Sequence, residues 1–355
     1  MTLNFLHPQF KFCGKTFSSK NELIAYCEDL AVSGTSTEKL EASGFILEWL
    51  NDSSHITAHT SGSTGRPKQI LLNKENVRNS AQATIEIFEL NPGSTALLCM
   101  STQYIGGKMM MARAMVGGWS IDVVTPSKNP LEAVHNSYDF TAMVPYQLFH
   151  SIDHLDKAKK IIIGGGIVST ELENRLQKCE STVFATYGMT ETISHIAVRA
   201  INGSGRSEIY QALPGVRLRQ DKDDCLIITA PKISDVPIET NDVVRLISDR
   251  EFIYLGRLDN VINSGGVKIY PESLERKLSN KIDVPFFIAS EKDPALGERV
   301  ILIVESTEST SSIEESFNAL HPFERPKKIY SLPTFIYTET GKIKRHAILE
   351  QLDIK

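Results

Sequence analysis

The 355-residue sequence has no long hydrophobic run, no excess of positive charge and no closely spaced cysteines. Its most apolar stretch, MMMARAMVGGW, contains Arg113 and is too short to cross a bilayer, so we expect no membrane insertion. A formal net charge of −5 argues against a protein that coats nucleic acid. The five scattered cysteines lack a C-x-x-C spacing, which favours reduced thiols over a disulfide framework or a zinc site.

The amino terminus, MTLNFLHPQFKFCGK, has no basic segment followed by an apolar run. We therefore expect no signal peptide and a cytoplasmic location. Hydrophobic residues make up 41% of the chain and charged residues 23%, which is typical of a globular protein. The length is sufficient for two or three domains.

Short β-rich runs alternate with helical patterns between residues 94 and 188, which predicts βαβ units and a mostly parallel sheet. The expected strands are 94–100, 120–125, 140–144, 160–166 and 182–188, with helices at 106–118 and 169–179. Near residue 200 short alternating strands begin, which indicates a small β-subdomain. A compact α+β unit follows. The sequence thus predicts an α/β fold with a large domain, 1–258, and a small carboxyl-terminal domain, 259–355.

The stretch HTSGSTGRPKQI combines two glycines with hydroxyl side chains and a lysine. Gly62 and Gly65 would allow successive backbone amides to point into one concavity that suits an anion. The pattern differs from the nucleoside-triphosphatase loop, because Lys68 follows a proline and precedes Gln69. The alternative is a solvated Gly/Ser turn. The additional donors to an anion would be Thr60, Ser61, Ser63, Thr64 and Lys68.

Two further stretches follow predicted strands. The backbone of GGGIVS, residues 164–169, could pass close to a flat ligand such as a purine. YGMTET, residues 187–192, supplies an aromatic face, the Thr190 hydroxyl and the Glu191 carboxylate, a hard oxygen ligand that suits Mg²⁺. The alternative for Glu191 is a solvated surface carboxylate.

Three later stretches also carry polar chemistry. Asp242 in ETNDVVRL could accept hydrogen bonds from both hydroxyls of a ribose, or it could be a turn residue. GRLDNVINSGGVKIYPESLE combines Arg257, Asp259 and a glycine pair with a helix start at Pro271. In TETGKIKR, Lys342 follows a Thr-Gly turn, where the alternative is an exposed basic hairpin.

In this order and spacing, the stretches resemble the adenylate-forming superfamily of acyl-CoA synthetases, firefly luciferases and peptide-synthetase adenylation domains, over residues 55 to 350. The resemblance implies ATP, Mg²⁺ and CoA as cofactor, metal and co-substrate. It also implies an acid-thiol ligase that forms an acyl-adenylate and then a thioester, with release of pyrophosphate and AMP. The small domain would be mobile.

Residue roles follow from the same resemblance. The matching stretch holds the β- and γ-phosphates of ATP, which implies this role for Thr60, Ser61, Gly62, Ser63, Thr64, Gly65 and Lys68. The residues that would border the adenine are Gly164, Gly165, Gly166, Tyr187 and Gly188. The remaining assignments are Thr190 to the α-phosphate, Glu191 to Mg²⁺, Asp242 and Arg257 to the ribose, Lys342 to adenylation, Asp259 to the hinge, and Gly265, Gly266 and Lys268 to a pantetheine tunnel.

The chain departs from the family pattern in its length and in its acyl-binding region. Only 58 residues precede His59, where the family usually has about 150, a difference comparable to a small domain. The usual gating histidine is replaced, with Gln103 or Tyr104 as substitutes.

Among compact members, the chain resembles bacterial o-succinylbenzoate-CoA ligases of menaquinone (vitamin K2) biosynthesis. Such a substrate carries a second carboxylate that needs a cation. Lys108 and Arg113 are candidates, and a solvated or ion-paired role is the alternative for each.

Two other functions are consistent with the sequence. A stand-alone adenylation enzyme would load an aryl or amino acid onto a carrier protein, and a non-catalytic module would only bind a nucleotide. We expect a small carboxylic acid, ATP and CoA as partners and no nucleic acid; a homo-oligomer is left open.

Overall fold

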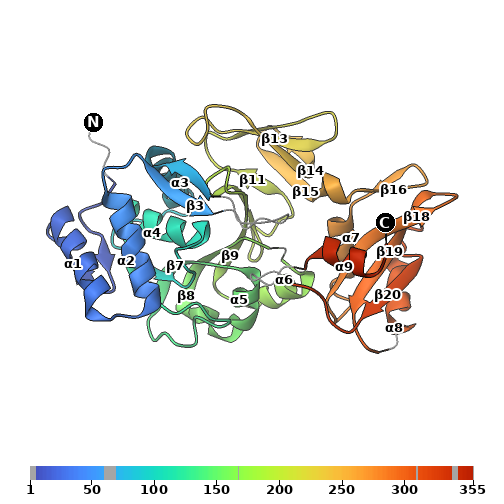
Figure 1. The fold of residues 1–355 in the computed structure, drawn as a ribbon, viewed down its shortest axis with the longest axis horizontal. Helices are drawn as coiled ribbons and strands as arrows, with labels where there is room; N and C mark the ends of the chain where they lie inside the picture. Colours follow the sequence, from blue (N-terminus) through green and yellow to red (C-terminus); the bar gives the residue numbers. More distant parts are fainter. Residues whose placement is uncertain (1–4, 60–68, 167, 309–310, 338–342, 355) are drawn as a thin grey trace.

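The computed structural model describes residues 5–59, 69–166, 168–308, 311–337 and 343–354. Figure 1 shows the amino-terminal helices at one end of the molecule and a carboxyl-terminal sheet at the other. The helices are α1 (Lys20–Ser33), α2 (Thr37–Leu50), α3 (Lys74–Ile87), α4 (Ile105–Gly117), α5 (Pro145–His150), α6 (Thr170–Leu176), α7 (Pro271–Leu278), α8 (Ser311–Glu314) and α9 (Arg345–Gln351). Within the described ranges, no helix is long and apolar enough to cross a membrane.

One large sheet runs through the first part of the chain, in the order β12-β13-β14-β15-β11-β10-β9-β8-β7-β5-β6-β1-β2. Its first strands are β1 (Lys11–Phe12), β2 (Lys15–Thr16), β5 (Thr95–Leu98), β6 (Ser120–Val123), β7 (Tyr138–Met143), β8 (Ala158–Ile163) and β9 (Thr182–Gly188). Within this part of the sheet, the neighbouring strands β1, β6, β5, β7, β8 and β9 pair in parallel. The edge strand β2 pairs antiparallel with β1. The predicted α/β fold with a mostly parallel sheet is confirmed.

The predicted β-subdomain continues this sheet through antiparallel pairs. Its strands are β10 (His195–Ala200), β11 (Tyr210–Ala212), β12 (Arg217–Gln220), β13 (Cys225–Thr229), β14 (Ile238–Ser248) and β15 (Glu251–Arg257). The sheet is continuous because β11 pairs with strands on both of its sides. Ala197 of β10 lies opposite Ala212 of β11, and Tyr210 of β11 lies opposite Phe252 of β15. Such long-range pairing leaves no local signal in the sequence.

Both faces of the parallel strands are covered. On β8, Ile162 belongs to the hydrophobic core that includes α2, α3 and α4, whereas Ile161 and Ile163 belong to the core that includes α5 and α6. A parallel strand buried on both sides is expected to be apolar along its length. This explains the KIII run that precedes the glycines at 164–166.

Local capping chemistry sets the helix boundaries. Ser169 is the N-cap of α6 and its hydroxyl accepts a hydrogen bond from the Leu172 amide at 3.1 Å. At the other end of α4, Gly118 adopts a left-handed conformation with φ of 71°. The helix predicted at 106–118 is therefore confirmed, and the one predicted at 169–179 is confirmed in its start but ends earlier, at Leu176.

The remainder of the chain forms a second sheet in the order β17-β16-β19-β18, to which β20 adds in parallel. Its strands are β16 (Ile262–Ser264), β17 (Val267–Ile269), β18 (Phe286–Asp293), β19 (Gly297–Glu305) and β20 (Lys328–Leu332). This part of the chain also contains one α-helical turn, α8, followed by the 3-10 helix Glu315–Ala319. A third, two-stranded sheet pairs β3 (His55–His59) with β4 (Gln69–Asn73).

Candidate functional site

The predicted adenine and ribose residues meet where β9 and β15 of the large sheet end, beside the interior of β14. Tyr187 at the end of β9 donates its hydroxyl hydrogen to Asp242 Oδ2 at 2.6 Å. Asp242 on β14 lies opposite Arg257 on β15, and its Oδ1 is 3.6 Å from Arg257 Nη1. Arg257 Nη2 also contacts Asp259 Oδ2 at 3.1 Å. The structure thus brings four sequence-predicted residues into one chain of contacts.

Burial strengthens the Tyr187–Asp242 contact. The Asp242 residue is 7% exposed. Burial of the phenol and the negative charge of Asp242 raise the pKa of Tyr187 well above its usual value, so the hydroxyl keeps its proton. A buried carboxylate held by one hydroxyl still has acceptor capacity for a further donor.

The three glycines follow β8 directly. The Gly164 amide donates to Met143 O at 3.3 Å, and Gly165 has φ of 77°. A Cβ added to Gly164 would lie 2.6 Å from Thr186 Oγ1, one residue before Tyr187. The Thr186 side chain therefore leaves little room for a Cβ at position 164, and this contact places the turn beside the end of β9.

Thr190 and Glu191 lie in the tight turn between β9 and β10. A Cβ on Gly188 would come 2.3 Å from Ser194 O, which shows how closely the two sides of the turn approach. The Met189 amide donates to Thr192 Oγ1 at 2.9 Å, and the Ile193 amide donates to Thr190 O at the same distance. The turn holds the Glu191 carboxylate exposed to solvent.

Glu191 suits the expected Mg²⁺ ion as a single ligand. The described part of the chain has no group of three or more His, Cys, Asp or Glu side chains that could hold a metal ion. Mg²⁺ in nucleotide sites is usually held by one or two carboxylates together with substrate phosphates and water. An exposed carboxylate on a rigid turn fits that ligand set.

The phosphate-loop residues from Thr60 to Lys68 lie outside the described residues. The strands on either side are described, and β3 and β4 pair antiparallel with His59 opposite Gln69. The roles of residues 60–68 in holding ATP stay predictions. The same holds for Lys342, which also lies outside the described residues.

The expected hinge residue lies in the connection to the second sheet, and the expected tunnel residues lie within that sheet. Asp259 is in the 3-10 helix Leu258–Asn260, directly after β15. Gly265 and Gly266, with φ of 58° and 83°, connect β16 to β17 in the two-residue turn that favours glycine. Lys268 follows on β17 and is exposed.

The candidate acid-binding residues on and before α4 differ in their surroundings. The Lys108 ammonium lies 2.6 Å from Glu48 Oε2, and Gln103 Nε2 donates to Glu41 Oε1 at 2.8 Å. Both partners come from α2. Tyr104 is the N-cap residue of α4 and is 45% exposed. The ion pair with Glu48 neutralises Lys108, which makes it a poor candidate for recognition of a substrate carboxylate.

Arg113 differs from Lys108 in having no acidic partner within 4 Å among the described residues. It is 2% exposed, and its Nε donates to Thr84 Oγ1 at 3.1 Å and its Nη2 to Ser194 Oγ at 2.7 Å. His195 Nδ1 lies 3.4 Å from Nη2. Burial lowers the pKa of Arg113 to about 9, so the guanidinium is charged at neutral pH without a counter-ion.

Sequence reasoning did not identify the residues around Arg113. Thr84 comes from α3. Ser194 comes from the β9–β10 turn and His195 is the first residue of β10, both more than 80 residues from Arg113. Burial and the nearby Arg113 charge lower the pKa of His195 well below its usual value, so the imidazole is neutral. The only sequence signal was that both residues lie within three positions after YGMTET, separated from it by Ile193.

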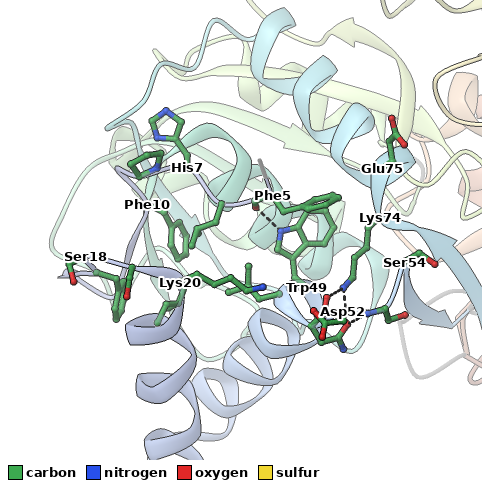
Figure 2. A pocket seen from close by; sticks show the side chains of 18 of the residues that line it. Phe5, His7, Phe10, Ser18, Lys20, Trp49, Asp52, Ser54, Lys74 and Glu75 are labelled. Atoms are coloured by element: carbon green, nitrogen blue, oxygen red, sulfur yellow. Dashed lines mark hydrogen bonds between the residues drawn. The ribbon is translucent and has the colours of Figure 1, made fainter. Parts of the chain in front are cut away.

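A separate hollow of about 630 Å³ lies between the amino-terminal segment and the ends of α2 and β4 (Figure 2). Trp49 forms part of its wall and donates Nε1–H to Phe5 O at 2.8 Å. Lys74 donates to Asn51 O and Oδ1 at 2.9 and 2.8 Å. None of the sequence-predicted site residues lines this hollow.

Comparison with known proteins also indicates an enzyme that binds a nucleotide. The family model of AMP-binding enzymes matches residues 35–224, more than half of the chain. The 2-succinylbenzoate–CoA ligase of Salmonella typhimurium is 24% identical, over 90% of this chain and 74% of that protein.

Solved structures extend the comparison to the fold. An AMP-forming acyl-CoA synthetase/AMP-acid ligase II-like protein from Dyadobacter fermentans is 34% identical, with a TM-score of 0.62 over 91% of this chain and 98% of that one. The o-succinylbenzoate coenzyme A synthetase of Bacillus subtilis in complex with AMP has a TM-score of 0.70 at 19% identity, over 82% of this chain and 68% of that one. The chain therefore belongs to the AMP-binding enzyme family, as an AMP-forming acid–CoA ligase.

Proposed function

We propose that the enzyme activates a dicarboxylic acid, 2-succinylbenzoate, as an acyl-adenylate and transfers the acyl group to CoA, in menaquinone biosynthesis. Enzymes of this class use ATP, Mg²⁺ and CoA. The observation that carries the choice of substrate is Arg113, a buried guanidinium with no carboxylate partner among the described residues. The relatives named 2-succinylbenzoate–CoA ligases support the same choice.

The electrostatics around Arg113 favour an anionic ligand. A buried charge without a counter-ion is costly, and a carboxylate that forms paired hydrogen bonds with a guanidinium offsets this cost. Thr84, Ser194 and neutral His195 hold the guanidinium without neutralising it. A substrate with a carboxylate remote from the reacting one would supply the missing charge.

The nucleotide would bind where β9 and β15 end, beside Asp242 of β14. Asp242 would accept hydrogen bonds from the ribose, with Arg257 beside it, and Tyr187 and Gly164–Gly166 would border the adenine. Thr190 would contact the α-phosphate, and Glu191 would hold Mg²⁺, which neutralises charge on the departing pyrophosphate. The residues from Thr60 to Lys68 would bind the β- and γ-phosphates.

The first reaction brings two anions together, because a carboxylate attacks the α-phosphate of ATP. Catalysis therefore depends on positioning and on positive charge, which Lys342 would supply between the two. The CoA thiolate then attacks the acyl-adenylate carbonyl, the acyl–phosphate bond breaks, and AMP leaves with the electron pair. We propose that residues 259–355 form a domain that rotates about Asp259 between these steps, which moves Lys342 away and brings the Gly265–Lys268 hairpin to the thiol.

The test is a coupled assay of AMP release with CoA across aromatic and aliphatic mono- and dicarboxylic acids. We expect the highest kcat/KM for 2-succinylbenzoate. An equal or higher value for a monocarboxylate would contradict the proposed substrate. Acyl transfer to a carrier-protein thiol but not to CoA would contradict the proposed acceptor, and an absence of pyrophosphate exchange with every acid would indicate a module that only binds nucleotide.

A further inference from the structure

Arg345 is anchored to the small sheet three residues after Lys342. It is the first residue of α9, and its Nη2 donates to Glu275 Oε2 on α7 at 2.7 Å. Glu275 is 9% exposed, and its other oxygen accepts a hydrogen bond from the Ile288 amide of β18 at 2.8 Å. The Arg345 guanidinium also lies 5.6 Å from the ring centre of Phe287. These contacts fix the start of α9 to both α7 and β18.

A second carboxylate on α7, Glu272, connects this anchor with the hinge. Its Oε1 accepts a hydrogen bond from Asn260, the residue after Asp259, and lies 4.0 Å from Arg345 Nη1. Glu272 is 5% exposed. Its Oε2 packs against β15, because a Cβ on Gly256 would come 2.3 Å from this atom. Glu272 therefore faces the anchor, the hinge and the last strand of the large sheet.

The contact between Glu272 and Arg345 is incomplete in this arrangement. Glu272 Oε2 and Arg345 Nη1 are both buried and have no hydrogen-bond partner among the described residues. Leaving a buried charged atom unpaired is costly. A small shift of the hinge relative to α7 would change the distance between these two atoms. The free-energy cost of leaving them unpaired therefore depends on the position of the hinge.

We propose that Arg345 is a positioning residue for the adenylation step, and that Glu272 couples its anchor to the hinge. Arg345 fixes the start of α9, three residues after Lys342, to α7 and β18. Rotation of residues 259–355 about Asp259 would then move the lysine together with these elements. This inference rests on the proposed function, in which Lys342 acts in adenylation only.

The expected effect is selective for one half-reaction. Lys342 must reach a defined point between two anions, and misplacement of a catalytic group by about 1 Å can cost on the order of 10²-fold in rate. The thioester step does not use this lysine in the proposed mechanism. A clamp that served stability alone would lower both half-reactions together.

The experiment compares two half-reactions in the full-length Arg345→Gln variant. We expect ATP–pyrophosphate exchange with the acid to fall by ~10-fold or more, and thioester formation from supplied acyl-adenylate and CoA to stay within about twofold of wild type. Arg299→Gln is the matched control, because Arg299 pairs with Glu291 at 2.6 Å on the same sheet. This control should leave both half-reactions unchanged.

Two further variants test the coupling. Arg345→Lys keeps the charge but cannot place one nitrogen at Glu275 and a second beside Glu272, so we expect partial recovery of exchange. Glu272→Gln should lower exchange selectively, and the double variant Glu272→Gln/Arg345→Gln should be no worse than Arg345→Gln alone, since the two residues act as a unit. If Arg345→Gln does not fold, the half-reactions of Arg345→Lys and Glu272→Gln still test the inference.

The outcomes separate this inference from the proposed function. If Lys342→Ala abolishes exchange while Arg345→Gln and Glu272→Gln exchange normally, the positioning role is wrong and the proposed function stands. If Lys342→Ala exchanges normally, the lysine assignment itself is wrong. Equal losses in both half-reactions of Arg345→Gln, with Arg345→Lys behaving alike, would show a purely structural clamp and overturn the inference.

Discussion

The Tyr187 hydroxyl donates a 2.6 Å hydrogen bond to the Asp242 carboxylate, across 55 residues of sequence. The bond joins the end of β9 to β14 and orients the carboxylate next to Arg257. An acceptor that is held in place before the nucleotide arrives loses less conformational freedom on binding. Two variants separate the carboxylate from the hydroxyl that orients it.

For Asp242→Ala we expect the KM for ATP to rise ~10- to 100-fold, as for the loss of one or two hydrogen bonds to a charged group. Tyr187→Phe should have a smaller effect, because the carboxylate remains. Steady-state kinetics with varied ATP and saturating acid would measure both. A larger effect of Tyr187→Phe than of Asp242→Ala would contradict the assignment of the carboxylate to the ribose.

Arg113→Gln should raise the KM for a dicarboxylic acid ~10- to 100-fold, because a charged, paired hydrogen bond to the remote carboxylate is lost. The KM for a matched monocarboxylic acid should change little. Lys108→Gln is the control, since Lys108 already pairs with Glu48 at 2.6 Å. Equal changes for the two acids in Arg113→Gln would remove this residue from substrate recognition.

His195 predicts a defined pH dependence of stability. Burial and the Arg113 charge hold its folded-state pKa well below 6.5, whereas the unfolded chain has a histidine pKa near 6.5. Below about pH 6.5 the unfolded state therefore binds a proton that the folded state does not, and stability falls as the pH falls. The groups that face the ring are Arg113, Thr84, Ser194 and Phe88.

Urea unfolding of wild type and His195→Gln at several pH values between 7.5 and 5 would measure this effect. The wild-type free energy of unfolding should decrease more steeply below pH 6.5, by up to ~1.4 kcal/mol per pH unit. The variant lacks this proton. Parallel curves for the two proteins would show that His195 does not titrate as the structure indicates.

Two adjacent glycines on α4 give a matched test of packing. A Cβ on Gly107 would lie 2.2 Å from Ser101 O, whereas one on Gly106 would meet only Met100 Cε at 3.4 Å as its nearest neighbour. Gly107→Ala should therefore destabilise the protein by ~1–3 kcal/mol, and Gly106→Ala should be neutral or stabilising by up to ~1 kcal/mol, since alanine favours helix. Thermal unfolding of both variants is the measurement, and an equal Tm would contradict the close approach at Gly107.

Much of the fold could be predicted from the sequence because its signals are local. Ser169 caps α6 through its own hydroxyl, and the apolar run before Gly164 is a buried parallel strand. The continuity of the large sheet could not be predicted, because it depends on the pairing of Tyr210 with Phe252. The glycine pair at 265 and 266 stood out in the sequence, but its place in the turn between β16 and β17 came from the structure.

The candidate site divides in the same way. Tyr187, Asp242 and Arg257 could be predicted because each lies in a short contiguous motif. The structure shows that Asp242 is in contact with both of the others. The surroundings of Arg113 come from three separate elements, so no spacing in the sequence could reveal them. Glu48 likewise neutralises Lys108 from a different helix, which separates two cations that are equivalent in the sequence.

The central claim is that Lys342 supplies positive charge to adenylation and then leaves the site before thioester formation. The most direct measurement is the rate of both half-reactions in Lys342→Ala. The account predicts that ATP–pyrophosphate exchange falls by at least ~10²-fold, comparable to the loss of one transition-state donor, while CoA still reacts with supplied acyl-adenylate at close to the wild-type rate. Equal losses in the two half-reactions, or unchanged exchange, would contradict it.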